Sequence, residues 1–196
     1  ARPIRSPRPP DPEGALTWFL ILLAIVAIGG ITIYNSLVKL RTQAQGAWAD
    51  IDVQLKRRWD LIPNLVETVK GYASHEKDTL EAVVNARSAA MGAQGPVAQA
   101  EAENMLTGAL KSLFALSEAY PDLKANQNFL DLQGQLAEIE NDIEMARRYY
   151  NGTARNLNIK VESFPRNIIA GMFGFSGAEF FEIEDQKDRQ IPQVKF

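Results

Sequence analysis

Residues 16–33 form an uninterrupted apolar run, LTWFLILLAIVAIGGITI, without a single charged side chain. A helix rises about 1.5 Å per residue, so this run with its two flanking residues just spans the roughly 30 Å hydrocarbon core of a bilayer. In a water-soluble domain the same run would need burial on every face. In lipid it satisfies its own backbone as a helix. The run therefore predicts a membrane-spanning helix over residues 15–34.

The ends of this run favour a retained anchor over a cleaved signal peptide. Trp18 and Tyr34 lie near its two ends, where amphipathic aromatic rings prefer the headgroup level, and we assign them as membrane-anchor residues. A signal peptide would be followed by a small-residue cleavage site, whereas Tyr34 is followed by Asn-Ser-Leu-Val. We therefore expect a single-pass anchor in contact with the lipid bilayer.

The flanks of the anchor give a weak indication of its orientation. Residues 1–14 are rich in proline and arginine, which predicts an extended or disordered tail. Three arginines precede the anchor, and two basic residues, Lys39 and Arg41, follow it closely. The positive-inside rule then favours the tail inside the cytoplasm and the main domain outside it.

The chain after the anchor, residues 35–182, predicts a helical bundle, followed by a charged tail over 183–196. Apolar residues recur at steps of three and four from Leu37 to Val69, so we expect the anchor to continue as one long helix, kinked near Pro63. A second helix is expected from Ser74 to Gly92, and a third between Pro96 and Pro121. The apolar stripe of the third helix is predicted as Ala98, Ala102, Met105, Ala109, Leu113 and Leu116.

A fourth helix, from Asn126 to about Ser163, has the clearest periodicity in the chain. Its apolar residues keep a repeat of about 3.5 residues, which is typical of near-antiparallel helix packing. They are Phe129, Leu132, Leu136, Ile139, Ile143, Ala146, Tyr150, Ala154, Leu157, Val161 and Phe164. The fold class is therefore predicted as all-α: a transmembrane helix continuing into a long antiparallel bundle of four main helices, plus an apolar C-terminal segment.

The apolar C-terminal segment is predicted to return to the level of the membrane. The fourth helix is long enough to descend nearly the whole height of the first, whereas the second and third reach only the distal half. The apolar side chains that follow are Phe164, Ile168, Ile169, Met172, Phe173, Phe175, Phe180 and Phe181. Either they pack on their own bundle, or they contact the membrane interface or a neighbouring protomer; we assign them as candidate contact residues.

The composition argues against several classes of function. A net charge of −3 gives no electrostatic footprint for nucleic acid, the absence of cysteine excludes thiol chemistry, and one histidine limits metal and acid–base chemistry.

Four acids lie close together on the fourth helix: Glu138, Glu140, Asp142 and Glu144. They could form a metal or ligand site, but the residues beside them are core positions, so we interpret them as a solvated face. The basic triplet at 56–58 is expected to form salt bridges to acidic neighbours.

Several long stretches resemble the LemA family of bacterial membrane proteins. They are Tyr34–Ala90, with IDVQLKRRWDLIPNLVETVKGYA at its centre, Tyr120–Asn151, Ser163–Glu182 and the terminal Pro192–Phe196. Asn156-Leu-Asn158 stands where a Tyr-Asn pair is expected in the family. The resemblance implies a short N-terminal segment, one helix in the bacterial inner membrane and a helical bundle, but no reaction and no catalytic residues.

Two functional hypotheses follow. The first is a non-enzymatic, membrane-anchored scaffold or interaction module, without cofactor, that forms a homo-oligomer and binds other membrane proteins. The second is a metal-binding or ligand-sensing membrane protein that uses the carboxylates of the fourth helix; it requires an inward-facing carboxylate pair with a raised pKa.

Overall fold

The structure is a computed structural model that describes residues 12–182. Within this range the elements are α1 (Pro12–Lys70), α2 (Lys77–Gly92), α3 (Pro96–Leu116), the 3-10 turn η1 (Ser117–Ala119), α4 (Pro121–Lys124), α5 (Gln127–Glu162) and α6 (Arg166–Met172). The predicted all-α class is confirmed. Most of the two predicted tails lies outside the described residues, although residues 12–14, expected in the first tail, already belong to α1.

The anchor and the first bundle helix form one continuous helix of 59 residues that passes through Pro63. Proline lacks the N–H that would bond to the carbonyl four residues earlier, which is that of Trp59. Arg87 of α2 donates its Nε–H to this carbonyl at 2.8 Å. A side chain from the neighbouring helix therefore replaces the backbone hydrogen bond that Pro63 cannot make.

The α2–α3 hairpin follows the prediction except at its start. α2 begins three residues after Ser74, because residues 71–76 form hydrogen-bonded turns that continue from the end of α1. Its end at Gly92 and the start of α3 at Pro96 are as predicted. Gly95, between them, has a φ of +82°, a backbone conformation that glycine adopts without the steric penalty of a side chain.

The buried stripe of α3 differs from the predicted one. Met105, predicted to face the core, is exposed, and Glu103 is fully buried. The residues that are buried along the helix are Gln99, Ala100, Ala102, Glu103, Leu106, Leu110 and Leu113. The alanine-rich sequence is compatible with both the predicted and the observed buried face. The observed face brings polar side chains into the core, where Glu103 pairs with α1 and Gln99 donates to the carbonyl of Ala90 in α2.

The seam of α5 matches the prediction closely. The side-chain oxygen of Asn126 caps the helix by accepting from the backbone N–H of Phe129 at 2.9 Å. The predicted seam is buried at Phe129, Leu136, Ile139, Ile143, Tyr150, Ala154 and Leu157. Phe164 lies beyond the end of the helix and is 79% exposed, so the repeat stops before it.

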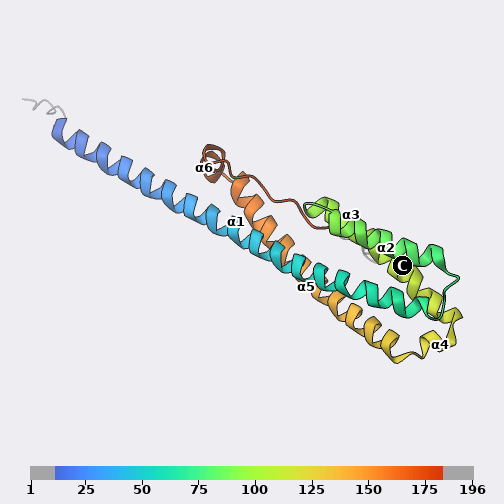
Figure 1. Cartoon of the computed structure of the whole chain (residues 1–196). Coiled ribbons are helices and arrows are strands. Elements are labelled where there is room, and N and C mark those ends of the chain that lie inside the picture. The colour runs from blue at the N-terminus through green and yellow to red at the C-terminus, as the bar shows by residue number, and fades with distance from the viewer. Residues whose placement is uncertain (1–11, 183–196) are drawn as a thin grey trace, which may run out of the picture.

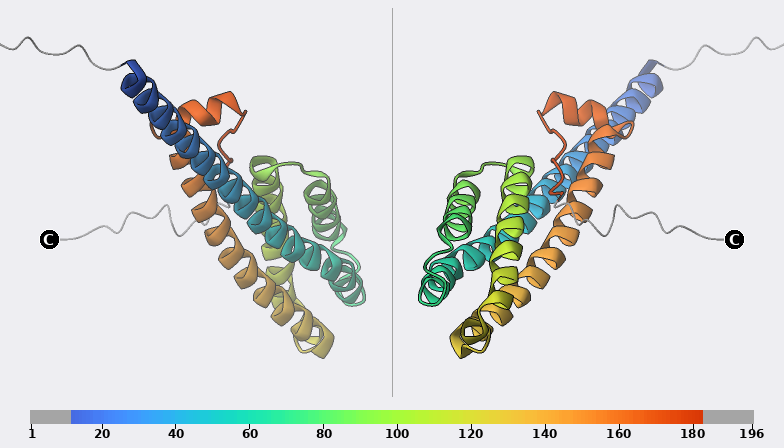
Figure 2. Two further views of the ribbon diagram at one scale, coloured as in Figure 1. Left: turned by 90° about the vertical axis from the view of Figure 1, so that its left-hand side faces the viewer. Right: turned by 90° about the vertical axis from the view of Figure 1, so that its right-hand side faces the viewer.

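The helices form a long bundle that changes composition along its axis. α1 and α5 run side by side, and the α2–α3 hairpin covers only the half distal to the anchor (Figures 1 and 2). In the distal core, side chains of all four helices pack together; Ile62, Val83, Leu106 and Phe129 belong to this cluster. Nearer the anchor the bundle consists of α1 and α5, covered by α6 and by the segment that follows it. We call residues 174–182 of this segment the strap.

Candidate functional site: a membrane-proximal collar

The membrane segment of α1 is exposed along most of its apolar length and is half-buried only at residues 29–30 and 33–34, beside α6. Its most apolar window has a mean hydropathy of 2.5 and no buried residue, unlike a core helix of a water-soluble domain. Trp18 is exposed, as an interfacial anchor requires. Tyr34 has a second role, because its ring packs edge-to-face on Phe173 and Phe175, with centroid separations of 4.9 and 5.5 Å.

α6 lies against α1 where the membrane segment ends. We call Phe164, α6 and Phe173, with the facing residues 27–41 of α1, the collar. Figure 2 shows α6 running across the end of α5 rather than along it. Phe173 and the Ile169 side chain of α6 border an apolar notch of about 320 Å³. The other lining residues, all on α1, are Ala27, Gly30, Ile31 and Tyr34.

The eight apolar residues proposed as membrane or oligomer contacts divide into three groups. Four have more than half of their surface exposed and remain candidates: Phe164, Ile168, Met172 and Phe173. Ile169 is half-buried against Leu37 and its neighbours. Phe175, Phe180 and Phe181 belong to the strap and pack on their own bundle, which corrects their assignment as contact residues.

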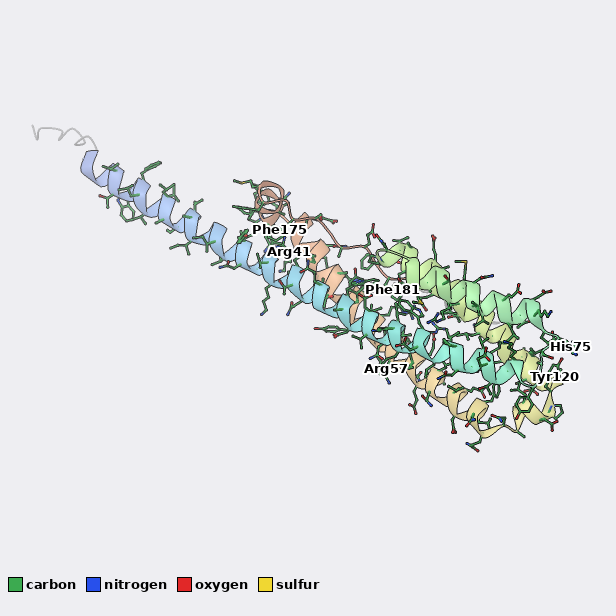
Figure 3. The ribbon with its side chains drawn as sticks, in the orientation of Figure 1. Arg41, Arg57, His75, Tyr120, Phe175 and Phe181 are labelled. Carbon is green, nitrogen blue, oxygen red and sulfur yellow. The ribbon has the colours of Figure 1, made fainter. Side chains whose placement is uncertain are left out.

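Phe181 and Phe175 are buried for identifiable reasons. The ring of Phe181 packs edge-to-face on Trp48 and belongs to the middle core with Ile51 and Ile143. Phe175 lies over Leu37, and the guanidinium carbon of Arg41 lies 4.8 Å from its ring centroid (Figure 3). The strap thus covers the part of the α1–α5 pair that α2 and α3 do not reach.

Two asparagines of α5 fasten the strap through its backbone. Asn158 accepts from the N–H of Ala178 at 2.7 Å and donates to its carbonyl at 2.9 Å. Asn151 makes the same pair of bonds to Phe181, at 2.9 and 3.0 Å. A side chain at position 177 has no room, because a Cβ on Gly177 would lie 2.8 Å from the Oδ1 of Asn158. We call these four hydrogen bonds the asparagine clamp. The sequence did not predict it, although the two asparagines are seven residues apart on one face of the helix.

A fully buried carboxylate, Glu103, lies in the centre of the bundle. It accepts from Arg58 at 3.1 Å, from the indole N–H of Trp59 at 2.8 Å and from Gln99 at 3.2 Å. Burial raises the pKa of Glu103 above its usual value, while the guanidinium of Arg58 opposes that shift. Every buried side-chain nitrogen or oxygen in residues 12–182 has a partner, so this cluster is a closed structural network.

Three of the four predicted acids of α5 form ion pairs. Glu140 pairs with Arg58 at 3.2 Å, and Asp142 pairs with Arg57 at 3.3 Å, which also confirms salt bridges for two of the three basic residues at 56–58. Glu144 pairs with Arg148 on its own helix. Residues 12–182 contain no group of three or more acidic, histidine or cysteine side chains placed to hold a metal ion.

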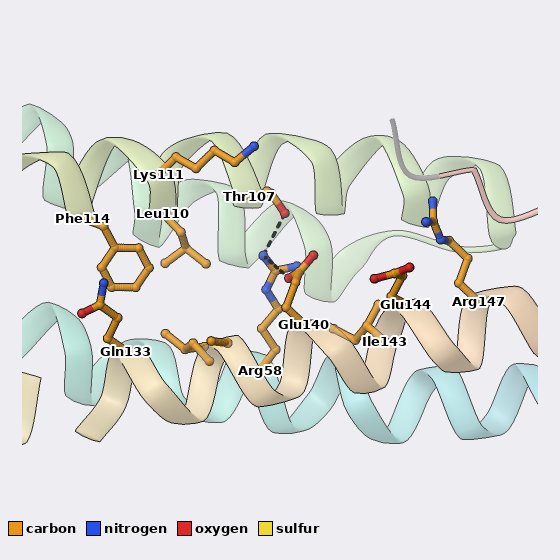
Figure 4. A pocket seen from close by; sticks show the side chains of 12 residues that line it. Arg58, Thr107, Leu110, Lys111, Phe114, Gln133, Glu140, Ile143, Glu144 and Arg147 are labelled. Carbon is orange, nitrogen blue, oxygen red and sulfur yellow. Dashed lines mark hydrogen bonds and ion pairs between the residues drawn. The ribbon is translucent and has the colours of Figure 1, made fainter. Parts of the chain in front are cut away.

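A groove of about 420 Å³ opens between α3 and α5 (Figure 4). Leu110 and Phe114 line it with apolar surface, while Glu140 and Glu144 supply carboxylates. The guanidinium of Arg58 reaches into it and donates to Thr107 at 2.8 Å. The groove is therefore amphipathic and carries charges of both signs.

Comparison with known proteins places the chain among bacterial membrane proteins. The family model described as "LemA family" matches residues 47–196. Protein LemA of Metamycoplasma hominis is 28% identical over 189 residues, which cover 92% of this chain and 85% of that protein. Magnetosome protein MamQ 1 of Paramagnetospirillum magneticum is 26% identical over 212 residues, covering 93% of this chain and 78% of the relative. Magnetosome protein MamQ of Magnetospirillum gryphiswaldense is 24% identical, covering 82% and 70%.

Proposed function

The chain belongs to the LemA family, and from that premise we propose that it is a non-enzymatic, membrane-anchored scaffold or interaction module that works as a homo-oligomer. We place it in the bacterial inner membrane with its bundle on the extracytoplasmic side. Its partners in this proposal are the bilayer, further copies of itself and other membrane proteins.

One observation carries the proposal: the membrane segment and the central bundle helix are the same 59-residue helix, α1. The distal core is built on this helix through Ile62, Leu65 and Val69. The bundle is thus held at a fixed height and direction relative to the anchor. Such an arrangement suits a protein that presents a surface to partners better than one that closes around a substrate.

The polar interior supports a structural role. Catalytic groups need an accessible atom and a pKa suited to proton transfer. Glu103, the one fully buried carboxylate of the described chain, has its oxygens engaged by Arg58, Trp59 and Gln99. It therefore acts as a tie between α1 and α3.

The outer face of the α2–α3 hairpin supports a binding role. A shallow groove of about 680 Å³ lies between these helices, lined largely by small residues. Ala82, Ala86, Ala89, Gly108 and Ala109 are among them. Small side chains let the backbone of a partner helix approach closely, and we assign this face to protein partners.

Mass photometry of the full chain in mild detergent tests the scaffold. We expect a discrete higher oligomer, and Ala89→Arg should shift it towards smaller species by placing a charge in the α2–α3 groove. Asn128→Arg, an exposed substitution on α5, is the matched control. A wild-type protein that is monomeric throughout would contradict the scaffold.

The anchor is tested separately by Ile25→Arg. An arginine at the centre of the span costs about 2.5–3.5 kcal/mol on the insertion scale, so the variant should largely leave the membrane fraction. Retention at the wild-type level would refute the anchor.

The α3–α5 groove favours ligand sensing as a second candidate function, because it brings Glu140 and Glu144 together with Arg58. The discriminating variant replaces Glu138, Glu140, Asp142 and Glu144 by glutamine. Under the scaffold proposal the cellular phenotype should stay near wild type, and the melting curve should shift only as far as the lost pair between Glu140 and the buried Arg58 requires. A lost phenotype with an unchanged melting curve would favour sensing.

A further inference from the structure

The collar lies at the height where the membrane segment leaves the hydrocarbon. The span from Leu16 to Tyr34 is about 28 Å long at 1.5 Å per residue, close to the thickness of the bilayer core. Tyr34 therefore marks the upper boundary of the hydrocarbon. Ala27 and Ile31, which line the collar notch, lie about 5–10 Å below that boundary.

We propose that the collar is a second membrane contact, in which α6 lies in the bilayer interface and a lipid acyl chain occupies the notch between α6 and α1. This inference rests on the proposed membrane anchoring of α1. It adds a lipid-binding surface that is separate from the span and is contributed by the other end of the chain.

The notch has the chemistry of an acyl-chain site. Its walls are the side chains of Ala27, Ile31, Ile169 and Phe173, with Gly30 and the Tyr34 ring between them. An apolar cavity without polar partners does not hold ordered water, since each water needs two or more hydrogen bonds. At this depth the molecules that surround the notch are lipid tails.

The outer surface of the collar is that of an interfacial helix. Met172 is 71% exposed and Phe164 is 79% exposed, although both are apolar. They lie with Ile168 and Phe173 on α6 or directly beside it. Figure 2 shows that α6 runs across the end of α5. A helix that runs across the bundle rather than along it can lie near the membrane plane, where apolar side chains reach the acyl boundary.

The part of the chain at the height of the collar carries an excess of basic residues. Lys39 lies about 8 Å beyond Tyr34 along α1, within the headgroup layer. On the described parts of the chain at this height, residues 34–46 and 158–177, the basic residues are Lys39, Arg41, Lys160 and Arg166, and the acidic one is Glu162. This stretch is positive although the whole chain has a net charge of −3. Juxtamembrane basic residues bind anionic headgroups.

The same charges argue for lipid rather than a second copy. Copies arranged about an axis along the membrane normal keep their collars at one height. If the collars of two copies packed on each other, the basic residues of both copies would come together. Like charges at an interface oppose association. A lipid bilayer matches both parts of the collar, because its acyl chains contact the apolar surface and its anionic headgroups contact the basic residues above it.

Site-directed fluorescence in vesicles tests the proposal, and the absence of cysteine makes single labelling simple. Phe173→Cys, Tyr149→Cys and Ile25→Cys replace side chains of matched exposure, 57, 58 and 61%. Each full-length variant is labelled with an environment-sensitive dye and reconstituted in phosphatidylcholine–phosphatidylglycerol vesicles. Quenching is measured with spin-labelled lipid and with aqueous iodide, and circular dichroism checks that each variant is folded.

We expect the label at position 173 to be quenched by spin-labelled lipid like the label at 25, and to be several-fold less accessible to iodide than the label at 149. Met172→Cys should repeat the result independently. Equal iodide accessibility at 173 and 149 would overturn the collar while leaving the anchor intact. Shielding of 173 from both quenchers would also overturn it, because a protein surface would then cover the collar. A label at 25 that lipid does not quench would end both the anchor and the collar.

Discussion

The hydrogen bond from Arg87 to the carbonyl of Trp59 allows a specific prediction about stability, because it replaces the backbone hydrogen bond that Pro63 cannot donate. Arg87→Ala leaves that carbonyl without its 2.8 Å donor in a partly buried site. A hydrogen bond from a charged donor contributes about 1.5–3 kcal/mol. We therefore expect Arg87→Ala to lower the free energy of unfolding by about 2 kcal/mol.

The decisive measurement repeats this substitution in a Pro63→Ala background. Alanine at position 63 restores the backbone N–H, which can bond to the Trp59 carbonyl in the ordinary helical pattern. Arg87→Ala should then remove only side-chain packing. We expect a coupling energy of about 1–2 kcal/mol in the double-mutant cycle, well outside the roughly 0.5 kcal/mol scatter of independent sites.

Equilibrium urea unfolding of the full chain in detergent, followed by circular dichroism, supplies the four free energies. Arg148→Ala, which removes an exposed ion pair with Glu144, is the control and should change stability by under about 1 kcal/mol in both backgrounds. If Arg87→Ala lowered stability equally with and without Pro63, the replacement of the missing backbone bond would be refuted.

Two further predictions concern the buried network and the strap. Arg58→Met removes the guanidinium that lowers the raised pKa of Glu103 and should destabilise the bundle by about 3–5 kcal/mol at neutral pH, as measured by urea unfolding. Since the folded-state pKa lies above the usual 4.5, this loss should shrink as the pH falls and Glu103 takes up a proton; a loss that grew towards low pH would contradict the assignment. Gly177→Ala should clash with Asn158 and release the strap, seen as several-fold faster hydrogen exchange at the clamped amides. Gly171→Ala, which meets no atom within 4 Å, should leave that exchange unchanged.

The sequence was sufficient for the helices because their signals are local and repeated. The 3.5-residue repeat of α5 predicts both its length and its buried face, and Asn126 and Gly92 mark helix ends through chemistry within one turn. The anchor is equally local, since a run without charge is defined by its own residues.

The polar core and the strap were not predictable in this way. Glu103 can be buried because Arg58 and Trp59, which lie 45 and 44 residues earlier in the chain, bind its carboxylate. The sequence around Glu103 does not indicate these partners. An apolar-stripe argument therefore finds Ala102 and Leu113 of α3 but misses Glu103 and wrongly places Met105 in the core. The strap was missed because Asn151 and Asn158 bind backbone atoms, which carry no sequence signature.

The pairing of α1 with α5 has a consequence for biosynthesis. Arg57 and Asp142 are 85 residues apart, so the apolar face of α1 leaves the ribosome long before its partner helix. At roughly 5–20 residues per second, translation needs about 4–17 s to cover that distance. During this interval the nascent chain is tethered to the bilayer by its anchor while an unpaired apolar helix face extends into water. The half-made protein therefore exposes apolar surface that the finished protein buries, and such surface favours aggregation.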